Sequence, residues 1–221
     1  PCVAAVVLCN ILILLMIRAG VLDHPVERSS HTRPTPKGGG IGIVGAFVLC
    51  LIPALRAAHA PAQIIPPVAG LLVGMILLGA VSWLDDMRPF PARYKLAAQF
   101  VAAIAAAFGA TYGTNTPAWE LVPLILATVF ITNALNFIDG INGLASGVMA
   151  IAAIFLASAG IMPVAFMLLT ICLLSFLPYN FPKARIFMGD VGSQPIGLAI
   201  AWGGMTGFGT GGGLLVIALL S

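Results

Sequence analysis

Charged residues are scarce in this chain, making up 8% of its 221 residues, whereas apolar residues make up 60%. A soluble domain carries about 25% charged residues, so these few charges cannot cover a water-facing surface. Cysteine is also rare, and Cys2, Cys9, Cys50 and Cys172 lie in apolar runs without a CxxC pair. These shortages exclude a large soluble domain and argue against a disulfide framework or a thiolate metal site.

What the chain has instead is a series of apolar runs, each long enough to cross about 30 Å of hydrocarbon. Spans are predicted near residues 1–17, 39–55, 66–84, 96–112, 119–137, 142–159, 162–178 and 191–207, and a ninth begins near residue 212. The uncharged stretch 140–182 is about twice the bilayer thickness, so it must fold back, near Gly160 and Pro163. The sequence therefore predicts an all-α polytopic membrane protein with about nine visible transmembrane helices.

We expect residues 1–221 to form one integral membrane domain that is trimmed at both ends. The chain begins with Pro1 rather than Met, and it stops at Ser221 inside an apolar run. A complete chain would then have about ten or eleven spans.

Charges of both signs gather on one side of the predicted bundle. Successive spans alternate in direction, and the loops of one set hold nine of the ten basic residues: Arg18, Arg28, Arg33, Lys37, Arg88, Arg93, Lys95, Lys183 and Arg185. The positive-inside rule makes this side cytoplasmic and places the N-terminus outside. Six of the seven acids share that side, namely Asp23, Glu27, Asp85, Asp86, Asp139 and Asp190. The rule does not require this bias of acids, so we expect the functional site on the cytoplasmic face.

The first acidic cluster is Asp85–Asp86, directly after the apolar run that ends at Leu84. Adjacent carboxylates repel each other, and near a membrane each prefers a cation or a proton. Metal binding or general-base chemistry is one interpretation. The other is a solvated helix end in which Arg88 neutralises Asp86.

The second cluster contains Asn133, Asn136 and Asp139, which are spaced three apart and would share one face of a helix. Amide and carboxylate oxygens suit Mg²⁺ or a phosphate-bearing ligand. Asn142 follows between two glycines, which permit close approach of the backbone. The alternative is a polar helix end that bonds to a neighbouring helix.

The third cluster surrounds Asp190, which begins the eighth span and could cap it. Gly189, Gly192 and Ser193 would leave backbone and hydroxyl donors open to an anion at a helix N-terminus. The fourth cluster, residues 23–40, is the most polar segment of the chain.

In the fourth cluster Arg28, Arg33 and Lys37 precede three glycines and a helix start, a combination that suits a diphosphate. His24 and His31 lack partners at metal-ligand spacing and are interpreted as solvated. The G-x-G-x-x-G pattern at residues 40–45 lies within a span, where small residues serve helix packing rather than nucleotide binding.

In this order, the four clusters resemble the polyprenyl-phosphate N-acetylhexosamine-1-phosphate transferase family. The matching pieces are residues 34–40, 85–86, 133–144 and 187–193. Residues 23–31 look most like the smaller members, which start lipopolysaccharide O-chains. The resemblance implies that an undecaprenyl phosphate oxygen attacks the β-phosphorus of a UDP-N-acetylhexosamine and releases UMP, with Mg²⁺ (or Mn²⁺) as cofactor.

The same resemblance implies roles for individual residues. Asp190 would hold Mg²⁺ together with Asn136. Asp85 or Asp86 would deprotonate or position the lipid phosphate, and Asp139 would orient the nucleotide. The substrate and phosphate contacts would come from Lys37, Arg28, Arg33, Asn133 and Asn142.

The resemblance also implies a bacterial inner membrane location and no nucleic-acid partner, and the glycine-rich spans could support a homodimer. Two departures from the family pattern stand out. First, many relatives have Asp where this chain has Asn142. Second, such relatives carry a His-rich motif in a cytoplasmic loop after the ninth span, and this sequence stops before that loop. The competing hypotheses are an inactive membrane scaffold and a secondary transporter, although no span has a charge near its centre as a transporter would need.

Overall fold

The computed structural model describes residues 1–23, 25 and 33–207. Within them the chain forms eight helices: α1 (Cys2–Ala19), α2 (Gly40–Ala57), α3 (Ile65–Met87), α4 (Ala92–Thr111), α5 (Ala118–Phe137), α6 (Leu144–Ser158), α7 (Pro163–Asn180) and α8 (Asp190–Gly207). Two short 3-10 helices, η1 (Ala62–Ile64) and η2 (Ile138–Gly140), precede α3 and follow α5. The all-α class is confirmed, and a helix lies at each of the eight segments predicted as spans up to residue 207. The predicted ninth span lies outside the described residues.

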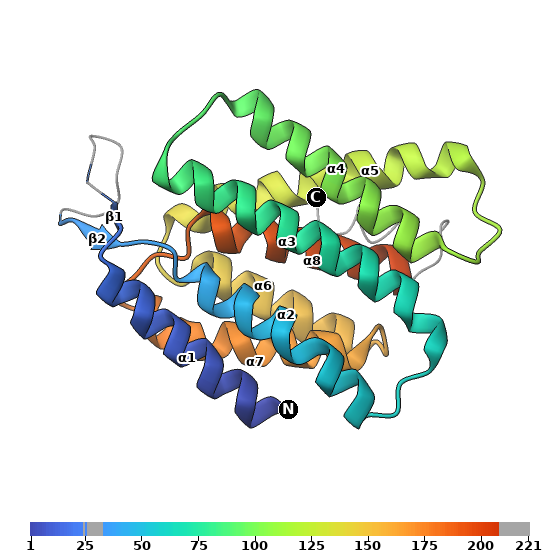
Figure 1. Ribbon diagram of the computed structural model, residues 1–221, viewed down its shortest axis with the longest axis horizontal. Helices are drawn as coiled ribbons and strands as arrows, with labels where there is room; N and C mark the ends of the chain where they lie inside the picture. The colour runs from blue at the N-terminus through green and yellow to red at the C-terminus, as the bar shows by residue number, and fades with distance from the viewer. Residues whose placement is uncertain (24, 26–32, 208–221) are drawn as a thin grey trace.

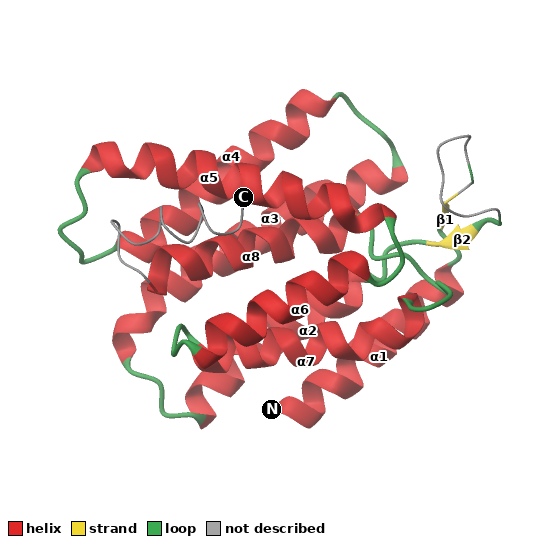
Figure 2. Cartoon of the chain, turned by 180° about the vertical axis from the view of Figure 1, so that it is seen from behind, coloured by secondary structure: helices red, strands yellow, loops and turns green. Residues whose placement is uncertain are grey.

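The only strands within the described residues are β1 (Leu22–Asp23) and β2 (Thr35–Pro36), which pair antiparallel beyond the end of α1. The long helices run alternately in opposite directions, so their connections gather at two ends of the bundle (Figure 1). We call the end that holds the loops after α1, α3, α5 and α7 the acidic end. Its opposite holds the N-terminus and the α2–α3, α4–α5 and α6–α7 connections (Figure 2).

Helix α8 is the centre of the bundle. Every residue from Val191 to Met205 is buried, and α8 packs against α2, α3, α4, α5 and α6. Because protein rather than lipid surrounds it, α8 can carry polar side chains such as Ser193 and Gln194. Six of the eight helices are long and apolar enough to cross a membrane; the exceptions are α8 and the shorter α6.

Glycines set how closely the helices approach. A Cβ at Gly40 of α2 would collide with the backbone of Gly192 in α8. Further along α2, Gly42 and Gly45 leave room for Ile13 and Leu12 of α1. The glycine pattern at residues 40–45 is therefore a helix-packing pattern, as predicted, and the fold-back between α6 and α7 also lies at Gly160 and Pro163.

A glycine pair at the far end of α3 and α4 generates a test of this packing. A Cβ at Gly109 would lie 2.7 Å from the carbonyl oxygen of Pro66 and 2.9 Å from the Cα of Gly70. Since backbone atoms cannot move aside cheaply, we expect Gly109→Ala to lower the free energy of unfolding by about 1–3 kcal/mol. Denaturant titration of the full-length protein in detergent micelles would measure this.

The matched control is Gly147→Ala in α6, where nothing lies within 4 Å of the added Cβ. Removing a helix-interior glycine there should stabilise the protein by up to about 1 kcal/mol. Equal effects of the two substitutions would contradict the close approach of α3 and α4.

Candidate active site at the acidic end

Four aspartates from three parts of the chain meet at the acidic end. Asp85 and Asp86 lie in the last turn of α3, Asp139 lies in η2, and Asp190 is the first residue of α8. They are brought together because α8 packs against both α3 and α5. Like charges at close range destabilise each other unless cations or hydrogen-bond donors separate them.

Lys95 bridges two of these carboxylates. Its Nζ lies 2.8 Å from Oδ2 of Asp85 and 2.9 Å from Oδ2 of Asp190. The other oxygen of Asp85 accepts a hydrogen bond of 3.0 Å from the backbone N–H of Phe90. Lys95 is missing from the predicted site residues, because the sequence shows it only as one of several cations near a loop.

A second lysine pairs with Asp86. The Nζ of Lys37 lies 3.1 Å from Oδ1 of Asp86, and both side chains are largely buried. The expectation that Arg88 neutralises Asp86 is therefore wrong, since the ion pair spans 49 positions in the sequence rather than two. The second oxygen of Asp86, Oδ2, is buried and has no hydrogen-bond partner.

Gly189 links Asp139 to Asp86. Its N–H donates a 3.1 Å hydrogen bond to Oδ2 of Asp139. Its φ of 75° lies in the left-handed region that favours glycine. A Cβ at this position would also lie 3.2 Å from Oδ2 of Asp86, so the position needs a glycine for two independent reasons.

The donors expected to face an anion at the start of α8 are already used within the protein. The N–H groups of Gly192 and Ser193 donate to the carbonyl of Gly189. The Ser193 hydroxyl donates to Oδ1 of Asn136 and to the same carbonyl. The predicted anion site on these donors is wrong, because they join α8 to its own first turn and to α5.

The backbone of the glycine-rich segment before α2 is occupied in the same way. The N–H groups of Gly39 and Gly40 each donate a 2.9 Å hydrogen bond, to the carbonyls of Phe187 and Met188 respectively. These glycines therefore join two loops instead of offering their N–H groups to a diphosphate. Lys37 remains the group of this segment that reaches the acids.

A buried chain of amides supports Asp190. Gln194, one turn along α8, donates to Oδ2 of Asp190 at 3.1 Å and accepts a 3.2 Å hydrogen bond from Gln99 of α4. Gln99 and Asn133 exchange two further hydrogen bonds, of 2.7 and 3.1 Å. Gln99 and Gln194 were not predicted, although each lies four residues after a charged site residue (Lys95 and Asp190), which is the spacing of neighbours on a helix face.

Asn133 and Asn136 lie in α5 and Asp139 lies in η2; they bond to α4, to α8 and to the residue before α8, respectively. Asn142 does not join them. Its side chain donates a 3.4 Å hydrogen bond to the carbonyl of Pro182. A residue that was not predicted, the buried Asn180, fixes the loops around it by bonding to Gly143 at 2.7 Å and Ile186 at 3.1 Å.

The predicted basic residues of the polar loop are only partly described. Arg33 is exposed and makes no ion pair with the four aspartates within the described ranges. Arg28, His24 and His31 lie outside the described residues.

The oxygen donors at this end suit a hard cation, although no ready-made cage exists. Among the residues that the structure describes, no three His, Cys, Asp or Glu side chains group as a metal site, since lysines stand between the carboxylates. Mg²⁺ commonly takes one or two carboxylates and completes its shell with waters and substrate phosphates. The partly exposed carboxylate of Asp190 and the amide oxygen of Asn136 fit that requirement.

Comparison with known proteins agrees with this geometry. The family described as glycosyl transferase family 4 matches residues 68–207, more than half of the chain. The decaprenyl-phosphate N-acetylglucosaminephosphotransferase of Mycobacterium tuberculosis is 34% identical, over 85% of this chain and 54% of that protein.

Two further relatives are similar over comparable stretches. The probable undecaprenyl-phosphate N-acetylglucosaminyl 1-phosphate transferase of Bacillus subtilis is 30% identical, over 85% of this chain and 55% of that protein. The phospho-N-acetylmuramoyl-pentapeptide-transferase of Moorella thermoacetica is 31% identical, over 81% of this chain and 63% of that protein. The chain thus spans between 54% and 63% of the length of these three curated relatives.

Removing the bridging lysine tests the electrostatics of this end. In Lys95→Met, Asp85 and Asp190 would lose the cation between them. Exposed ion pairs contribute about 0–1 kcal/mol and breaking buried ones costs about 3–5 kcal/mol. Because Lys95 and its partners are partly exposed, we expect the free energy of unfolding to fall by about 1–2 kcal/mol, measured in detergent with a chelator present.

Lys183→Met is the control, because Lys183 is an exposed lysine at the same end. It should leave the unfolding free energy within about 0.5 kcal/mol of the parent value. If both variants behaved alike, the Lys95 bridge would have no energetic role.

Proposed function

The chain belongs to glycosyl transferase family 4, and on that premise we propose that it transfers an N-acetylhexosamine 1-phosphate from a UDP-sugar to undecaprenyl phosphate. A phosphate oxygen of the lipid attacks the β-phosphorus of the UDP-sugar, UMP leaves, and the sugar stays on the lipid through a diphosphate. The names of the M. tuberculosis and B. subtilis relatives, which pair a polyprenyl phosphate with N-acetylglucosamine phosphate, support this reaction class. Its product would begin a cell-envelope glycan.

The observation that carries the proposal is the cluster of four aspartates and two lysines at one end of a membrane bundle. A lipid phosphate can reach only a site at the membrane surface, and two of the aspartates lie in the last turn of α3, a helix long and apolar enough to cross a membrane. Both substrates and the leaving group are anionic, so the site needs cations that stabilise phosphate charge. Lys37 and Lys95 supply them among the described residues.

We assign the lipid phosphate to the carboxylates of α3. Oδ2 of Asp86 is buried without a hydrogen-bond partner, so it is free to accept a proton or a hydrogen bond from a phosphate. Lys37 pairs with the other oxygen of the same carboxylate and can contact a phosphate oxygen. Asp85, fixed by Phe90 and Lys95, would position the attacking group.

We assign the nucleotide side to η2 and the loops around it. Asp139 is oriented by the N–H of Gly189 and would orient the nucleotide. Asn142 lies beside Pro182 at the rim and would contact the sugar or nucleotide, with Arg33 and Arg28 contributing phosphate contacts. Asn133 would act through the amide chain that leads to Asp190.

Mg²⁺, or Mn²⁺ in its place, would be held by Asp190 together with Asn136. When bound, a divalent cation neutralises the phosphate charge that develops during the transfer. The chain's own contribution is to orient its ligands: Ser193 fixes the amide of Asn136, and Gln194 and Lys95 fix the carboxylate of Asp190. The excess of basic residues at this end supports a cytoplasmic site in a bacterial inner membrane.

A transporter receives no comparable support. The described acids near the site end their helices or begin them, whereas transporters place ionisable groups near the bilayer midplane. The hypothesis of an inactive scaffold is distinguished from that of an enzyme by an activity measurement.

The first experiment is UMP release by the full-length protein in detergent, with undecaprenyl phosphate and a panel of UDP-sugars. We expect release that requires both the lipid and Mg²⁺, because the proposed transfer consumes the lipid and uses the cation for charge neutralisation. The panel would also identify the sugar. Absence of release with every sugar, from a well-folded sample, would favour the inactive scaffold.

Removing one carboxylate tests the residue assignments. We expect Asp190→Asn and Asp86→Asn each to lower kcat by about 10²-fold or more, because each removes a charge or proton acceptor from the reaction centre. Glu120→Gln, which changes an acid in the first turn of α5 at the opposite end, should retain parental activity. Unchanged kcat in Asp190→Asn would refute the metal assignment.

A further inference from the structure

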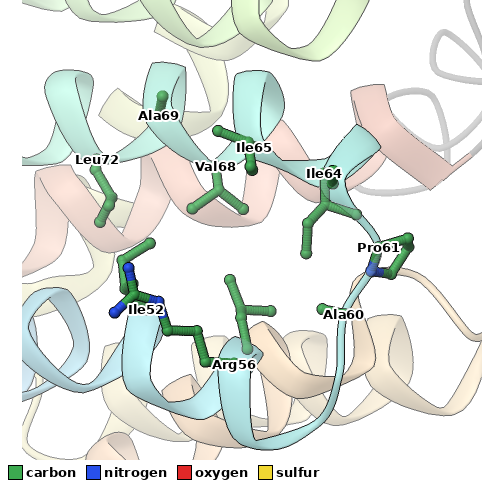
Figure 3. Close-up of a pocket in the computed structure, with 11 residues that line it drawn as sticks. Ile52, Arg56, Ala60, Pro61, Ile64, Ile65, Val68, Ala69 and Leu72 are labelled. Atoms are coloured by element: carbon green, nitrogen blue, oxygen red, sulfur yellow. The ribbon is translucent and has the colours of Figure 1, made fainter.

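An apolar pocket opens between α2 and α3 at the end of the bundle opposite the acidic end (Figure 3). Its volume is about 310 Å³, and its walls include Ile52 and Leu55 of α2 and Val68 and Leu72 of α3. Both helices are long and apolar enough to span a membrane. The pocket therefore offers lipid hydrocarbon a place between two spans.

One charged residue, Arg56, lines this pocket. In Figure 3 its side chain runs back along α2 toward Ile52 instead of extending past the end of the helix. Among the described residues it makes no ion pair and no side-chain hydrogen bond. Arg56 lies in the last turn of α2 and is exposed, so its guanidinium is open to an anionic group at the membrane surface.

Further along the same two helices, nearer the acidic end, the surface is hollowed again. A second pocket, of about 290 Å³, lies between the same helices and is lined by Val48, Met75 and Trp83. From Ile65 to Trp83 the two pockets together follow α3 over about 27 Å, close to the thickness of the hydrocarbon core. A chain that begins at Arg56 thus has room to extend into the bilayer along the groove.

We propose that the groove between α2 and α3 binds an anionic phospholipid, with its phosphate on Arg56 and an acyl chain in the apolar pocket. Arg is suited to this role because its planar guanidinium bonds phosphate oxygens in pairs. A lipid with a net negative charge is favoured over a zwitterionic one, since no acidic side chain lines the pocket to hold the second, positive group. The proposal concerns the opposite end from the four aspartates and does not depend on the transferase activity.

The test compares two lipids on the full-length protein. Micelles of the purified protein are supplied with phosphatidylglycerol or with phosphatidylcholine of identical acyl chains, and bound lipid is counted by native mass spectrometry. An Arg near a membrane surface adds about 1 kcal/mol of attraction for anionic lipid, so we expect about fivefold more phosphatidylglycerol than phosphatidylcholine retained. Arg56→Gln should bring this ratio close to one, and Arg56→Lys should keep most of it.

Two substitutions by phenylalanine distinguish lipid bound in the pocket from lipid that adheres elsewhere on the protein. Ala69→Phe fills the pocket from α3 and should reduce retention of phosphatidylglycerol several-fold. Val73→Phe places the same aromatic side chain at an exposed position of α3 outside the pocket (58% exposed) and should retain lipid as the parent does. Both variants should keep the parental thermal midpoint, which checks that the helices remain folded.

Three results would overturn the proposal. The first is equal retention of the two lipids by the parent protein, or no retained lipid at all, as when another part of the chain fills the groove. The second is an unchanged preference in Arg56→Gln. The third is equal retention by Ala69→Phe and Val73→Phe.

Discussion

The acidic end depends on the pairing of clustered carboxylates with two lysines. Four aspartates at one end of a bundle would repel one another strongly in surroundings that water screens poorly. Lys95 lies between Asp85 and Asp190, and Lys37 reaches Asp86 from the segment before α2. The ion pairs connect α3 to α4, to α8 and to the start of α2, so the packing of these helices and the chemistry of the site rest on the same contacts.

The backbone of α8 makes that arrangement possible. Gly192 lets α2 approach until the two backbones touch, and Gly189 lies next to a carboxylate of α3 and bonds one of η2. A side chain at Gly189 would push Asp86 away from the position that leaves its Oδ2 buried and unpartnered. The glycines of this segment thus contribute close approach, and their N–H groups serve the protein itself.

The sequence predicted the helices well because the bilayer imposes a simple rule of length and hydrophobicity. It also predicted that Asp85, Asp86, Asp139 and Asp190 would share one end of the bundle, since loop charges reveal direction. Pairings could not be predicted in the same way. Arg88 was an alternative partner for Asp86 because it is near in sequence, whereas Lys37 is near in space. The sequence did not identify Gln99, Gln194 and Asn180. The role of a buried amide depends on its hydrogen-bond partners on other segments, and these are known only from the structure.

The contrast between two neighbouring helix pairs explains where the bundle is closed and where it is open. Helices α3 and α4 close on each other because Gly70 faces Gly109, so backbone meets backbone. Between α2 and α3 the walls are mainly branched apolar side chains such as Ile52, Val68 and Leu72, while the glycines of α2 face α1 and α8. Branched side chains hold the two backbones apart. The space that remains has apolar walls, which suit the hydrocarbon chains of membrane lipids. The same choice of residues that fixes α8 against its neighbours therefore leaves a lipid-facing groove on the other side of α3.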